Sequence, residues 1–86
     1  RIDETITIYE TKVLPTYQSL GDRHMLVVDR GYLALHLLTR NAKGDRKRAG
    51  SLLKMALADA KAMRLPEADV IVDIMIDQGF EIRDPG

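Results

Sequence analysis

The chain has 86 residues, 45% of them hydrophobic and 30% charged, with a formal net charge of zero and no cysteine. This length and composition indicate one globular domain and exclude a disordered segment, and the low aromatic content of 5% predicts an aliphatic core. The lack of cysteine excludes disulfides, thiolate metal sites and cysteine nucleophiles, and no long apolar run or signal peptide is visible, so we expect a cytoplasmic protein.

The first predicted element is a helix over residues 2–20, in which apolar residues recur at steps of three and four. These residues are Ile2, Ile6, Tyr9, Val13, Tyr17 and Leu20. Pro15 should kink or split this helix, because an interior proline removes a hydrogen bond and crowds the preceding turn. The alternative is a short strand over residues 5–9, which alternate and are rich in β-branched side chains. That strand would pair with residues 80–83 and make the fold α+β.

Residues 22–40 form the clearest predicted helix. Its polar residues Asp22, Asp29, His36 and Arg40 fall on one narrow stripe, and nearly all the rest is apolar or small. A helix that is apolar on most sides is a central one with neighbours on both flanks. Gly31 in its middle predicts a place where another backbone comes close.

The third predicted helix covers residues 45–64. Apolar residues with several alanines lie on one arc and leave a shallow face that permits close helix packing, and Asp45 is the predicted N-cap. Lysines follow the opposite side at seven-residue spacing: Lys47, Lys54 and Lys61.

The fourth predicted helix begins at Pro66 and ends at Gly79, the expected C-terminal cap. Its apolar residues cover more than half of its circumference, and residues 80–82 should fold back on the core. Four helices joined by short loops predict an all-α fold, a small four-helix bundle whose second helix is central. We expect a single helical domain over residues 1–86. Because the chain begins at Arg1, we further expect it to be excised from a larger protein.

The charges cancel overall but are segregated along the chain. Residues 23–64 carry ten lysines and arginines against three aspartates, whereas residues 65–86 carry one arginine against six acidic residues. Segregation of this kind indicates either internal pairing of opposite faces or attraction to a partner. We expect the third and fourth helices to neutralise each other in part and the loop over residues 40–48 to stay unpaired.

A basic cluster at a helix start attracts phosphate, because the free backbone amides and the helix dipole add to the side-chain charge. One candidate function is therefore a nucleic-acid-binding domain. The alternative is a solvated interhelical loop, which would have the same basic sequence pattern. Its phosphate contacts would be Arg40, Lys43, Arg46, Lys47, Arg48 and Lys54. The fourth helix is excluded as a major-groove reader, since it carries four acidic residues and no lysine or arginine.

The fourth helix carries an acidic file of three aspartates spaced four residues apart. Like charges at this spacing destabilise a helix by a few tenths of a kcal/mol per pair, so an ion-pair partner or simple solvation is expected.

Two of the predicted helices have apolar arcs that are too wide for one neighbouring helix each. This surplus apolar surface predicts an oligomer, most simply a homodimer, or a protein partner. Our first hypothesis is a non-enzymatic interaction module of a regulatory protein, either a dimerisation or a docking domain. Its interface would consist of Asp69, Val70, Asp73, Ile74, Met75 and Asp77.

No catalytic arrangement can be assembled from the sequence. Neither serine stands in a nucleophile elbow, and the glycines form no phosphate-binding loop. The two histidines stand apart and show no metal-ligand spacing. We therefore expect no enzyme, no cofactor and no metal, and the chain resembles no family closely enough to carry residues across.

Overall fold

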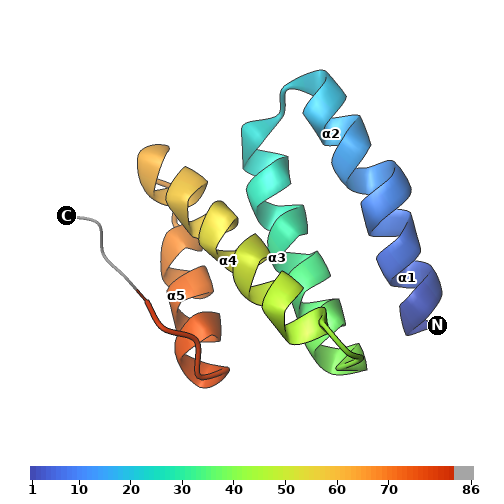
Figure 1. The fold of residues 1–86 in the computed structure, drawn as a ribbon. Helices are drawn as coiled ribbons and strands as arrows, with labels where there is room; N and C mark the ends of the chain where they lie inside the picture. Colours follow the sequence, from blue (N-terminus) through green and yellow to red (C-terminus); the bar gives the residue numbers. More distant parts are fainter. Residues whose placement is uncertain (83–86) are drawn as a thin grey trace.

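A computed structural model describes residues 1–82, which contain helices and no strand. The elements are α1 (Ile2–Ile8), η1 (Tyr9–Val13), α2 (Leu14–Leu20), α3 (Arg23–Arg40), α4 (Asp45–Ala62) and α5 (Glu67–Asp77). Figure 1 shows α1 to α2 as one long rod beside α3, with α4 lying across the other side of α3 and next to α5. The predicted all-α four-helix bundle is confirmed.

The strand pair proposed as an alternative is wrong. Residues 5–8 belong to α1, and residues 80–82 are not in a strand, while Arg83 lies outside the described residues. Threonines tolerate the helix here because their hydroxyls donate to the carbonyl four residues earlier, as Thr5 does to Arg1 and Thr7 to Asp3.

Pro15 changes the helix type without breaking the rod. It lies in the first turn of α2, directly after the π-helical segment η1. There the N–H of Leu14 donates to the carbonyl of Tyr9, five residues earlier. A wider turn accommodates the proline ring and the carbonyl that it leaves without a donor.

The predicted central position of the second helix is confirmed, because α3 contacts every other helical element among residues 1–82. Its Leu33 and Leu37 are at most 2% exposed. The alanine face of α4 packs against this core, with Ala49, Ala56 and Ala60 fully buried. Small side chains let the two helix axes approach closely. None of the described helices is long and apolar enough to cross a membrane.

Both ends of α5 follow the sequence pattern. Pro66 is the N-cap residue, and Gly79 has a φ of 75° just after the helix. The N–H of Phe80 donates to the Met75 carbonyl at 2.8 Å, which closes a Schellman-type cap. The Phe80 ring then lies against Gly50 of α4, where a Cβ would stand 3.0 Å from the ring. Phe80 and Ile82 pack on the core, as predicted for the tail.

A positive φ at Arg64 leads to a stability prediction. Arg64 has a φ of 54° in the turn between α4 and α5, where its side chain is exposed. A residue with a Cβ is strained in this conformation, so Arg64→Gly should raise the free energy of unfolding by about 0.5–1 kcal/mol. Urea denaturation followed by circular dichroism measures this change. Gly79→Ala, at a φ of 75°, is the matched control and should lower stability; a loss in both variants would contradict the prediction.

Candidate functional site

A groove lies between α3 and α5. It has a volume of about 210 Å³, and only these two helices line it. The lining residues are Val27, Val28, Gly31, Tyr32, Leu35, Glu67, Val70, Ile71 and Ile74. All but Glu67 are apolar, glycine or aromatic, so the groove is an apolar surface open to water.

The floor of the groove belongs to the core and its walls do not. Val27 and Ile71 are 1% and 3% exposed, whereas Tyr32 and Val70 are 51% and 57% exposed. Full burial of a large apolar side chain contributes about 1.5–3 kcal/mol, so a partner that covers these two side chains would bind more favourably. Large exposed apolar surface is typical of interaction sites.

Gly31 lies in the α3 wall of this groove. A Cβ built on it would meet nothing within 4 Å, so the close backbone approach predicted from this glycine is not made within residues 1–82. Glycine in a helix interior is destabilising by roughly 0.5–1 kcal/mol relative to alanine. No contact among the described residues offsets this cost, and the bare backbone of α3 faces open space.

Glu67 stands at one end of the groove. One carboxylate oxygen, Oε2, lies 2.9 Å from His24 Nε2, and this hydrogen bond lowers the pKa of the Glu67 carboxyl below its ordinary value. The other oxygen, Oε1, is buried and has no hydrogen-bond partner among the described residues. A buried carboxylate oxygen without a donor is unfavourable, and a backbone hydrogen bond of Glu67 itself also lowers the pKa of this carboxyl.

The structure divides the six predicted interface residues. Val70 and Ile74 line the groove, and Asp69, Asp73 and Asp77 are exposed beside it on α5. Met75 does not belong to this surface. It is 1% exposed and fills the core, because it lies on the side of α5 that packs into the bundle.

The sequence did not reveal the α3 wall of the groove. Tyr32, Val28 and Leu35 line it from α3, and none of them was in the predicted interface. The signal that could have found them is the combination of an unusually wide apolar arc on residues 22–40 with a glycine in its middle. The arc was interpreted as evidence for a central helix and the glycine as a place of close backbone approach, but neither led to the inclusion of α3 residues in the predicted interface.

The expected neutralisation between α4 and α5 is absent among the described residues. Asp69, Asp73 and Asp77 form no ion pair with any residue in the range 1–82, and neither do Lys47 and Lys54. Lys54 and Lys61 line a cavity together with Met75 of α5, but none of the three aspartates belongs to that lining. The acidic file and the lysine stripe are therefore both solvated.

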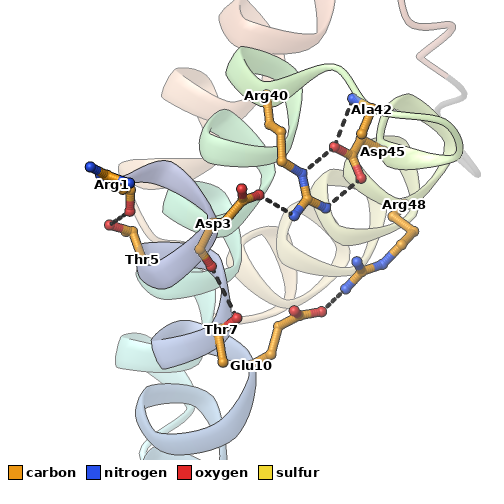
Figure 2. A network of polar contacts seen from close by, with 9 residues as sticks. All are labelled: Arg1, Asp3, Thr5, Thr7, Glu10, Arg40, Ala42, Asp45 and Arg48. Carbon is orange, nitrogen blue, oxygen red and sulfur yellow. Dashed lines mark hydrogen bonds and ion pairs between the residues drawn. The ribbon is translucent and has the colours of Figure 1, made fainter.

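The loop over residues 40–48 is engaged inside the fold, contrary to expectation (Figure 2). The guanidinium of Arg40 donates to both oxygens of Asp45, at 2.7 and 2.8 Å, and to Asp3 at 3.0 Å. Asp45 is 2% exposed and also accepts from the N–H of Ala42 at 2.9 Å. The predicted N-cap is wrong: Gly44 occupies that position, because the Asp45 carboxylate is turned back towards Arg40.

Two further loop arginines also have partners. Arg48 pairs with Glu10 of η1, and Arg46 donates to the carbonyl of Gln78 while its guanidinium lies 4.4 Å from the centroid of the Phe80 ring. Lys43, Lys47 and Lys54 are exposed and form no ion pair with the described residues. Half of the predicted phosphate contacts therefore hold helices together, and nucleic-acid binding stays a prediction.

Comparisons with models of known protein families, with curated proteins and with solved structures found no match. Among residues 1–82, no three histidine, aspartate or glutamate side chains gather as a group that could hold a metal ion. The groove between α3 and α5 combines an apolar lining with exposed walls on two helices.

Proposed function

We propose that this domain is a non-enzymatic interaction module that docks another polypeptide chain in the groove between α3 and α5. One observation carries the proposal: Gly31 leaves the α3 backbone bare and open in the middle of an apolar groove. Small residues at such a position allow a partner helix or strand to approach closely. The half-exposed Tyr32 and Val70 beside it are suitable anchors, since aromatic and apolar side chains at the centre of an interface dominate binding energy.

The chemistry around the groove supports docking over catalysis. Its lining includes one ionisable carboxylate, Glu67, which already pairs with His24, and no serine or cysteine. A reaction site needs a nucleophile or an acid and base arranged around a reacting atom. An apolar groove is instead suited to holding a side chain or a helix face.

In this proposal the module serves as a dimerisation or docking domain of a cytoplasmic regulatory protein. The nucleic-acid alternative has less support, because Arg40, Arg46 and Arg48 already have partners within the fold. Phosphate binding would have to break those pairs or depend on the remaining lysines.

Site-specific photo-crosslinking in the organism that encodes the protein tests this proposal. A benzophenone amino acid in place of Val70 should form a covalent adduct with the docked chain, whereas the same amino acid in place of Lys54 on α4 should not. Gly31→Leu should abolish the adduct from position 70 by filling the groove. Adducts of equal yield from both positions, or none from position 70, would show that the groove is not the docking surface.

A further inference from the structure

Resting on the proposed function, we infer that the occupant of the groove is an amphipathic α-helix of another protein, with lysine or arginine along the flank that faces α5. Its apolar side would present large side chains to the groove, and its basic flank would meet the acidic file.

The shape of the groove fits a helix. From Val27 to Leu35 the α3 wall is about 12 Å long, slightly more than two helical turns. Val70 and Ile74, one turn apart, form the opposite wall. Two helical walls present the ridges between which a third helix packs, and apolar anchors at i, i+3, i+4 and i+7 fill such a groove. The missing side chain at Gly31 lets the incoming helix lie close to α3.

The charges that border the groove are negative. On α5, Asp73 follows Val70 by three residues and Asp77 follows Ile74 by three, so the carboxylates lie next to the apolar wall. No lysine or arginine occurs on α5, and no ion pair within residues 1–82 offsets the repulsion along the file. A basic flank on the incoming helix would relieve that repulsion.

A second copy of this chain fits the groove less well. Pairing two grooves around a two-fold axis would place the acidic α5 either on the acidic α5 of the second copy or on the uncharged groove wall of its α3, and neither offers a basic flank. The basic helix face that this chain can offer is the outer side of α4. Among the described residues, Met55, 49% exposed, is the one large and well-exposed apolar side chain beside Lys47 and Lys54, and its neighbours Ser51 and Ala58 are small. A single apolar anchor does not supply the i, i+3, i+4 and i+7 series that such a groove takes.

Peptide binding provides the test. The probe is a synthetic helical peptide of about 18 residues with leucines at heptad spacing and lysines along one flank, and its partner probe carries glutamates in place of those lysines. The lysine peptide should bind the intact chain at least about tenfold more tightly than the glutamate peptide in fluorescence anisotropy, and salt should reduce the difference. The double variant Asp73→Lys, Asp77→Lys should reverse the preference.

Gly31→Leu is the deciding variant. It should abolish binding of both peptides while keeping or raising the melting temperature, because a Cβ at this position meets no neighbour and leucine is a better helix former than glycine. Ser51→Leu, which adds the same side chain to the exposed face of α4, is the matched control and should bind like the unchanged protein. Lysine-peptide binding that survives Gly31→Leu would mean adhesion to charge alone and would overturn the inference.

The remaining outcomes separate this inference from the proposed function. Equal binding of both peptides, lost in Gly31→Leu, would overturn the basic partner and leave the docking groove standing. No peptide binding, together with a sedimentation-detected dimer that Gly31→Leu dissociates, would identify a second copy as the occupant. A monomer that binds neither peptide would overturn the inference, and a missing adduct from position 70 would overturn the proposed function with it.

Discussion

Leu37→Ala should lower the free energy of unfolding by about 2–5 kcal/mol, because it removes a fully buried side chain from the helix around which the others pack. Leu37 is 0% exposed and lies in the core of α3. A domain of 86 residues has a total stability of about 4–13 kcal/mol, so the loss is a large share of the total and should shift the unfolding midpoint clearly. Urea denaturation followed by circular dichroism measures the loss.

The matched control is Leu20→Ala at the end of α2. Leu20 is 71% exposed, so the same truncation there should change stability by less than about 0.5 kcal/mol. Similar losses in the two variants would contradict the central role of α3. Circular dichroism of the folded baselines would also show whether Leu37→Ala keeps its helices, since cavity formation lowers stability more than it changes secondary structure.

The helical fold could be predicted from the sequence because its periodicity is strong and its loops are short. The wide apolar arc of residues 22–40 predicted a central helix, and α3 contacts all the other helical elements of the described chain. The β-branched run at residues 5–9 was ambiguous because alternation over so few residues also fits a helix with one buried position. Only Ile6 of that run is buried, and Ile8 is 48% exposed.

The α5 wall of the groove could be predicted from the sequence, and the α3 wall could not. Val70 and Ile74 followed from the helical wheel of α5, but their partners Tyr32 and Leu35 depend on which helix lies beside α5. A wide apolar arc also does not show which part of it enters the core. For that reason Met75 was assigned to the surface although it is 1% exposed.

The partners of the basic loop depend on tertiary contacts that local spacing does not contain. Arg40 binds Asp3, which lies 37 residues away, and Arg48 binds Glu10, which lies 38 residues away. The ion-pair partners of such arginines cannot be identified from the sequence without the fold. Here those arginines join the first helical rod to α3 and α4.

The pairing of Arg40 with Asp45 makes stability depend on acid pH. The hydrogen bonds from the Arg40 guanidinium lower the pKa of the Asp45 carboxyl to about 2, from an ordinary value of 3.8. Between these values the unfolded chain binds more protons than the folded one, so stability rises with pH. The contribution of this pair should be complete above about pH 4 and should be lost as the pH falls towards 2. Melting temperatures measured across this range show the effect.

Removal of the Arg40 guanidinium should lower the stability of the fold at neutral pH and also reduce its dependence on acid pH. Arg40→Leu leaves the Asp45 carboxylate 2% exposed without its main partner, so the melting temperature at neutral pH should fall by several degrees. Protonation of Asp45 would then relieve an unpaired buried charge, so the variant should lose less stability between pH 4 and pH 2 than the unchanged chain does. Lys43→Leu removes a cation from the same loop at an exposed position and should show neither change. Identical pH profiles for the two variants would mean that Arg40 acts only as one more surface charge.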